Sequence, residues 1–177
     1  MSSSDPASLG AHGVRRRLLI VAALLGLAGC GFKPMYAERS GVSVNDDLQA
    51  VRIAPLPNRI GQILHNYLRD DINPYGQPAQ PVYELRIGLA ETTEDSGIRR
   101  DETASREIIT MRAAFELVDI KADSVVYEGQ ARTSTAYNIL DDRFASIISA
   151  DNARDRALRE LSADIKLRLA AYFSARR

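Results

Sequence analysis

The sequence predicts an α+β fold, a two-layer sandwich in which two helices pack on a four-stranded, mostly antiparallel sheet in the order β-α-β-β-β-α. In residues 59–72, and in a last segment that ends near Ser174, apolar side chains recur every three or four positions, as on one side of a helix. In residues 83–89, 109–117 and 124–137 they recur every second position, as in strands with one covered face. A two-layer sandwich satisfies both kinds of element.

The first strand is short and precedes the first helix. Residues 51–56 contain β-branched side chains and the run ends at Pro55 and Pro57, which predicts a brief strand near an edge of the sheet. The helix over residues 59–72 follows and ends at the sequence NPYG, residues 73–76. Its expected apolar stripe consists of Ile60, Ile63, Leu64, Tyr67, Leu68 and Ile72.

The next three strands are expected to pair as antiparallel neighbours because a short connection joins the last two. The polar residues 91–106 indicate a long hairpin connection between the first two, into which the strand ends can extend. The predicted inward sets are Tyr83, Leu85, Ile87 and Leu89; then Ile109, Met111, Ala113, Phe115 and Leu117; then Val125, Tyr127 and Ala131. The last helix starts before Asp151, and its inward stripe is Leu158, Leu161, Ile165, Leu169 and Tyr172.

The apolar run over residues 18–28 indicates an export signal. It is shorter than the roughly 20 residues needed to span a membrane. Three arginines, residues 15–17, precede it and small residues close it, which is the order of a secretory signal. Because residues 1–13 add nothing to such a signal, Val14 is an alternative site of translation initiation.

The signal ends in Leu27-Ala28-Gly29-Cys30, which resembles the lipobox of bacterial lipoproteins. In such proteins the cysteine takes an S-diacylglycerol group, the chain is cut before it, and the new amino terminus is acylated, here as N-palmitoyl-Cys30. The alternative is an ordinary signal peptide with a coincidental cysteine. Cys30 is the only cysteine, so no intramolecular disulfide competes for it. We therefore expect a signal peptide over residues 1–29, a lipidated tether over 30–47 that holds the protein at the membrane, and one domain over 48–177.

Composition and motifs argue against several functional classes. The chain has 23 basic and 23 acidic side chains, whereas nucleic-acid binders show a basic excess, so we expect no nucleic-acid partner. After loss of the signal, His65 is the only histidine, and zinc sites usually combine several Cys and His ligands. We expect it on the surface of the first helix.

No nucleophile elbow, phosphate-binding loop or H-E-x-x-H motif occurs. The adjacent acidic pairs, such as Asp70-Asp71, lack the regular spacing of a calcium loop. We therefore expect no enzymatic activity, no metal and no cofactor, and a role in binding or assembly.

Several short segments of the sequence are weak signals individually, but their order and spacing resemble the LptE family in its alphaproteobacterial form. The members of this family are the LPS-assembly lipoproteins of the outer membrane. The resemblance extends over essentially the whole mature chain. The segments are CGFKPMY at residues 30–36, RIGQ at 59–62, NP at 73–74, YEL at 83–85, Arg106, YNILD at 137–141, and residues 153–173.

The resemblance implies a lipoprotein anchored at the periplasmic face of the outer membrane. It would sit in the lumen of an LptD-type β-barrel, the LPS translocon subunit, assist its assembly, plug it, and contact lipopolysaccharide on its way to the cell surface. An auxiliary lipoprotein of a lipid ABC-transport system is the alternative, and an esterase is a third.

The candidate lipopolysaccharide contacts are Arg99, Arg100 and Arg106, which lie in or beside the predicted hairpin connection. Planar guanidinium groups suit the phosphates or other acidic groups of lipid A. The alternative is that Asp101 and Glu102 neutralise these arginines and the connection is simply solvated.

Overall fold

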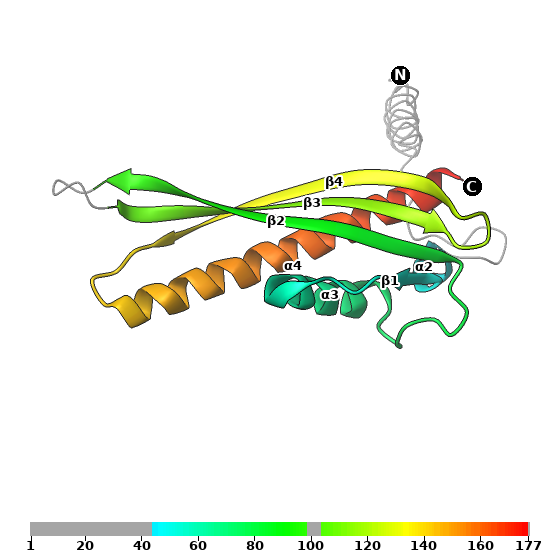
Figure 1. Cartoon of the computed structure of the whole chain (residues 1–177), viewed down its shortest axis with the longest axis horizontal. Coiled ribbons are helices and arrows are strands. Elements are labelled where there is room, and N and C mark those ends of the chain that lie inside the picture. The colour runs from blue at the N-terminus through cyan, green and yellow to red at the C-terminus, as the bar shows by residue number, and fades with distance from the viewer. Residues whose placement is uncertain (1–43, 99–103, 177) are drawn as a thin grey trace, which may run out of the picture. The chain divides into compact units, whose positions relative to one another are not determined.

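The computed structural model describes residues 44–98 and 104–176. Figure 1 shows four strands in one layer, with α3 and α4 in a second layer on one face of the sheet. The described elements are α2 (Val44–Gln49), β1 (Val51–Ile53), α3 (Asn58–Ile72), β2 (Tyr83–Ile98), β3 (Ala104–Asp119), β4 (Ser124–Asn138) and α4 (Arg143–Ala175). The predicted two-layer α+β fold and its order of strands and main helices are confirmed.

The sheet has the strand order β1-β2-β3-β4 and is mixed. β2, β3 and β4 pair as antiparallel neighbours, as predicted. β1 pairs in parallel with the start of β2, Val51 opposite Tyr83, because α3 carries the chain back across the sheet between the two strands. β1 is an edge strand of three residues, shorter than residues 51–56.

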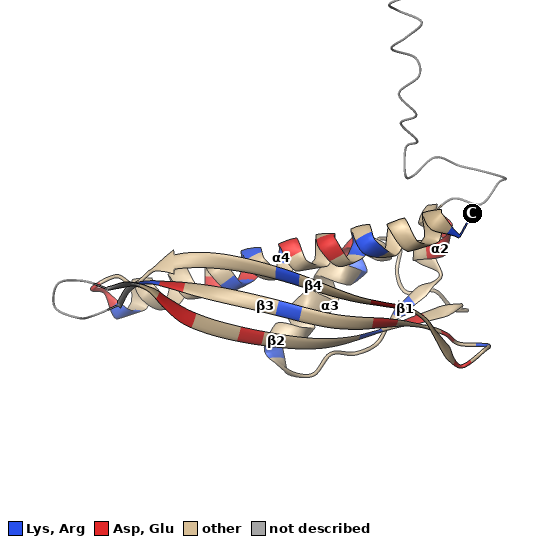
Figure 2. Ribbon diagram, turned by 90° about the horizontal axis from the view of Figure 1, so that it is seen from above, with Lys and Arg blue, Asp and Glu red and all other residues tan. Residues whose placement is uncertain are grey.

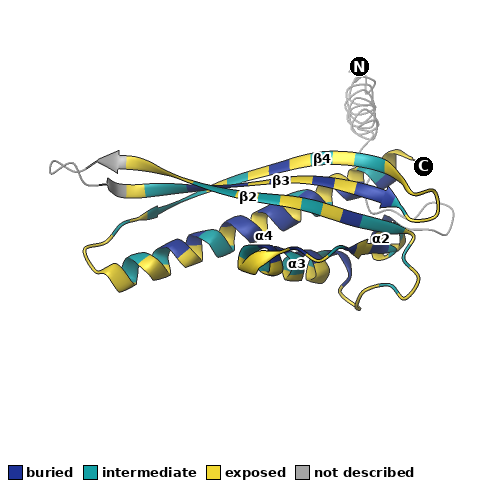
Figure 3. Ribbon diagram, in the orientation of Figure 1, coloured by how far each residue is buried: buried dark blue, intermediate teal, exposed yellow. Residues whose placement is uncertain are grey.

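The core lies between the helices and one face of the sheet, and Figure 3 shows the buried residues of α4 along that side. The predicted inward set of β3 is fully buried, and the stripes of α3 and α4 pack against it. At the end of the core Tyr172 stacks on Tyr127, with ring centroids 4.8 Å apart, and Phe173 contacts Tyr83 at 5.4 Å.

Polar side chains join α3 to α4 across the helix layer. Tyr67 donates a hydrogen bond to Asp155, and Arg159 donates to both, at 3.1 Å to the Tyr67 hydroxyl and 2.6 Å to Asp155. Ser162, fully buried, donates to Asp71 at 2.6 Å. These contacts fix α3 beside the middle and C-terminal parts of α4, so the first turns of α4 extend past the start of α3, as Figure 1 shows.

Two segments differ from the sequence prediction. Most of residues 91–106, expected as a connection, is strand, because β2 continues to Ile98 and β3 begins at Ala104. The pairing there is sustained by backbone hydrogen bonds, and the side chains include several threonines and carboxylates. The second segment is α2, a third helix within residues assigned to the tether. Its Val44 and Leu48 are buried in the core.

A β-bulge corrects the prediction for Val125. Leu117 pairs with Tyr127 but Val118 pairs with Val125, so β4 has one extra residue, Val126, at this point. An extra residue turns the following side chain to the other face of the sheet. Val125 therefore does not share a face with Tyr127 and is 46% exposed.

Candidate functional site

One end of the domain combines the described part of the predicted arginine cluster with the start of α4. Arg106 is exposed near the start of β3, opposite Gly97 on β2 and Asn138 on β4. Arg99, Arg100 and the proposed lipidation site Cys30 lie outside the described residues. Of the three candidate arginines, the structure thus describes Arg106 alone, and this residue is accessible to a ligand.

The first turns of α4 are apolar but exposed. The exposed large apolar side chains here are Leu140, Phe144, Ile147 and Ile148, with exposed fractions of 46%, 71%, 51% and 44%. We call these four residues the apolar patch. Patches of this kind on a soluble domain commonly mark a contact surface for another molecule.

Local hydrogen bonds hold the apolar patch in place. Asp142 caps α4 by accepting hydrogen bonds from the backbone N–H groups of Phe144, at 2.8 Å, and Ala145, at 3.2 Å. The Ser146 hydroxyl donates to the carbonyl of Leu140 at 2.9 Å and accepts from its N–H at 2.8 Å. The sequence did not predict this helix start, because the apolar residues here do not face the core.

A hollow of about 280 Å³ separates the first turns of α4 from the sheet. Its lining includes Glu107, Tyr137, Arg143, Ile147 and Arg154. Tyr137 donates a hydrogen bond from its hydroxyl group to Glu107. Burial is the largest cause, and this hydrogen bond the second, of a pKa of Tyr137 that is raised to about 12. Arg154 bonds to Glu91 at 2.9 Å and to Asp151 at 3.0 Å, and the Glu91 carboxylate raises the pKa of Arg154.

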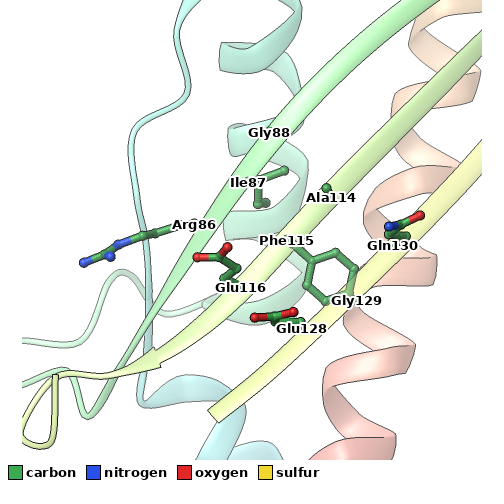
Figure 4. A pocket seen from close by; sticks show the side chains of 9 residues that line it. All are labelled: Arg86, Ile87, Gly88, Ala114, Phe115, Glu116, Glu128, Gly129 and Gln130. Carbon is green, nitrogen blue, oxygen red and sulfur yellow. The ribbon is translucent and has the colours of Figure 1, made fainter. Parts of the chain in front are cut away.

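The second candidate surface is the face of the sheet opposite the helices, which we call the open face. Within it Gly88 and Ala114 lie side by side on β2 and β3, and Ala114 lies opposite Gln130 on β4. Gly88 has no side chain and that of Ala114 is short, which leaves room for a hollow of about 620 Å³, shown in Figure 4. Phe115, 2% exposed, places its ring under Gly129 at the edge of this hollow.

The open face carries charges in an ordered arrangement. Near β1, Glu84 accepts from Arg52 at 2.6 Å and from Arg86 at 2.8 Å, and the guanidinium groups of Arg86 and Arg52 lower the pKa of Glu84.

On one side of the hollow Glu116 lies opposite Glu128, and further along the same two strands Arg112 lies opposite Arg132. Figure 2 shows these basic and acidic segments on β3 and β4. Sequence analysis did not identify this arrangement, because it depends on the register of β4.

Groups suited to catalysis or metal binding are sparse in the described part of the chain. His65 lies partly exposed on α3, beside Pro55 and Leu56 in a shallow hollow. Within residues 44–98 and 104–176, no three His, Cys, Asp or Glu side chains are grouped as metal ligands.

The fold and these surfaces agree with a comparison to known families. A family model described as LptE, lipopolysaccharide-assembly, matches residues 48–169. The chain belongs to the LptE family. This confirms the resemblance found in the sequence.

Solved structures share the fold of this LptE-family domain. A chain described as a lipoprotein of Caulobacter crescentus CB15 has 25% identity and a TM-score of 0.64, over 76% of this chain and 97% of that chain. The rare lipoprotein B of Shewanella oneidensis has 8% identity and a TM-score of 0.53, over 71% and 95% of the two chains. A lipoprotein B of Nitrosomonas europaea has 15% identity and a TM-score of 0.54, over 71% and 84%. A search of curated proteins gave no match.

Membership assigns the protein to a family of lipopolysaccharide-assembly lipoproteins, which is not a family of enzymes. Among the described helices, none has both the length and the apolar character required to cross a membrane.

Proposed function

We propose that this protein is anchored through Cys30 at the periplasmic face of the outer membrane, assists assembly of an LptD-type translocon barrel, and plugs its lumen. In that position it contributes to the insertion of lipopolysaccharide at the cell surface. The observation that carries the proposal is the family match over residues 48–169, which spans nearly the whole folded domain. The binding surfaces, rather than a catalytic centre, agree with such a role.

We further propose that lipopolysaccharide contacts the end of the domain where Arg106 and the first turns of α4 lie, and that Arg99 and Arg100 take part in this contact. Lipid A is an amphiphile, with acyl chains and acidic groups, and its binding requires both apolar and cationic groups. Arg106 is exposed at this end, and the apolar patch lies on α4 and just before it, beside the hollow that Arg143 lines. Arg99 and Arg100 continue the same connection.

Affinity purification of the full-length lipoprotein from gently solubilised membranes tests the assembly role. We expect one large outer-membrane barrel to co-purify, and we expect depletion of the lipoprotein to reduce folded barrel and make the envelope leaky to large hydrophobic compounds. Recovery of inner-membrane components, with normal barrel levels and defective phospholipid transport, would instead favour the ABC-transport alternative.

Cys30→Ala tests the anchor. The lipidated form rests on Leu27-Ala28-Gly29-Cys30, and Gly31, in place of an aspartate, suits onward sorting to the outer membrane. The variant should accumulate as an unprocessed or soluble form that incorporates no labelled palmitate. Unchanged labelling would exclude Cys30 as the modified residue.

A triple variant, Arg99→Glu, Arg100→Glu and Arg106→Glu, tests the lipopolysaccharide contact. Exposed ion pairs contribute only about 0–1 kcal/mol, so the purified domain should remain folded. Binding to lipopolysaccharide should weaken, and the wild-type interaction should fade as salt rises. A control that reverses Arg59 and Arg156, both exposed on the helix layer, should bind as the wild type does. If the triple variant binds lipopolysaccharide as well as the wild type does at low salt, these arginines are not the contact.

A further inference from the structure

One corner of the open face is apolar. Val82 precedes β2, Ile120 follows β3, and Val125 lies at the start of β4, with exposed fractions of 38%, 37% and 46%. The backbone N–H of Ile120 donates to the carbonyl of Val82 at 3.0 Å, and Val125 lies opposite Val118. Val118 shares the face of Glu116, outside the main core, and is nevertheless 3% exposed because these neighbours cover it. We call Val82, Ile120 and Val125 the end patch.

The end patch lies where the folded domain follows the tether. The backbone N–H of Val82 donates at 3.0 Å to the carbonyl of Ala50, the residue after α2. α2 has 6 residues, a length of about 9 Å, and Figure 1 shows it at the same end as the turn between β3 and β4. Val44 lies fourteen positions after Cys30, a stretch that spans at most about 50 Å. A lipid on Cys30 would therefore keep the end patch near the bilayer.

Charged side chains of both signs surround the end patch. On β1 and β2, Arg52 and Arg86 share Glu84, at 2.6 Å and 2.8 Å. Lys121 and Asp123 are exposed in the turn that follows β3. Phospholipid head groups with a phosphate and an ammonium group can pair with both signs, while aliphatic side chains enter the boundary between head groups and acyl chains. A free anion such as phosphate would satisfy the basic side chains alone.

The anchor makes a small contact surface sufficient. The end patch has three aliphatic side chains, too few to hold an untethered domain on a membrane. A short flexible linker converts this contact into an intramolecular one, with an effective concentration in the millimolar range. Inside a barrel the wall would separate the domain from the lipid, so this contact belongs to the lipoprotein that has not yet entered a barrel.

We propose that the end patch docks on the phospholipid leaflet that holds the anchor, and that it keeps the unassembled lipoprotein against the membrane surface. This inference rests on the anchor at Cys30, which is part of the proposed function.

Fluorescent probes in the full-length lipoprotein test the inference. Because Cys30 is the only cysteine and carries the lipid in the proposed function, an introduced cysteine is the only free thiol. Ile120→Cys and, separately, Val125→Cys are labelled with an environment-sensitive dye and reconstituted into vesicles of phosphatidylethanolamine and phosphatidylglycerol. The control is Leu167→Cys, at an aliphatic side chain of α4 that is 51% exposed. Spin-labelled lipids should quench the dye at both end-patch positions at least about threefold more than at the control, because the end patch enters the head-group layer.

The outcomes separate this inference from the proposed anchor. If the wild-type lipoprotein itself takes up the dye, Cys30 is a free thiol, and the anchor and the inference both fail. If the wild type takes up none and quenching at Ile120 and Val125 equals that at Leu167, the anchor stands and the docking surface is wrong. A dye that is shielded from water at the end patch but not quenched by lipid would identify a protein occupant, such as a second copy, and would also overturn the inference.

Discussion

At the residue scale, the ring of Phe115 leaves no room for a side chain at Gly129. A Cβ atom at this position would lie 2.4 Å from Cζ of Phe115, which is itself buried. We expect Gly129→Ala to destabilise the domain by about 1–3 kcal/mol, the usual cost of overpacking a core. At Gly88 the nearest atom is 3.9 Å away, so Gly88→Ala should be close to neutral. Urea unfolding compares the two variants, and equal midpoints would contradict the explanation.

Tyr137 gives the domain a dependence on alkaline pH. Burial and Glu107 raise its pKa from 10.0 to about 12, so the folded state favours the neutral phenol. The associated stabilisation is complete below the unfolded pKa of about 10 and is lost as the pH rises through about 12. In Tyr137→Phe this contribution is absent, so the stability advantage of the wild type should shrink over that interval. Tyr75→Phe, at a side chain that is 91% exposed, is the control. Parallel pH profiles of wild type and Tyr137→Phe would rule out the assignment.

At the element scale, periodicity predicted the segments that face the core and missed those that do not. The α3 stripe and the β3 alternation are buried in the structure as expected. In α2 only Val44 and Leu48 face the core, too few to form a recognisable stripe. The end of β2 and the start of β3 carry many polar side chains, so apolar alternation did not show where these strands end and begin. The first turns of α4 expose their apolar side chains, so the helical stripe did not show where this helix begins.

The first turns of α4 depend on their cap more than on packing. Phe144 is 71% exposed, and the Asp142 carboxylate accepts from two backbone N–H groups there. Loss of an N-cap costs about 0.5–2 kcal/mol. We expect Asp142→Ala to leave global stability nearly unchanged while hydrogen exchange of the first turn accelerates about fivefold or more, because these turns can open locally. Asp142→Asn keeps an acceptor oxygen and should preserve protection. If both variants lost protection from hydrogen exchange equally, the charge of Asp142 and not its capping hydrogen bonds would stabilise the first turn.

At the scale of the whole molecule, the sequence could predict family and fold but not the pattern of charge on the open face. That Arg112 meets Arg132 depends on how β4 is aligned with β3, and the bulge near Val126 shifts that alignment for the residues preceding it. A shift of one residue exchanges the two faces of a strand, so single-strand patterns do not determine which side chains become neighbours. The arginines of the hairpin connection were recognised because they lie close together in the chain.

Lipopolysaccharide contact and barrel assembly are separate parts of the proposed function, so a variant should be able to lose one and keep the other. We expect the triple reversal of Arg99, Arg100 and Arg106 to weaken lipopolysaccharide binding while barrel recovery stays at the wild-type level. The control, Arg59→Glu with Arg156→Glu, should leave both properties unchanged. Lipopolysaccharide binding and barrel recovery are measured in parallel for each variant. If the triple variant lost both properties, barrel assembly and glycolipid contact would depend on the same residues and could not be separated.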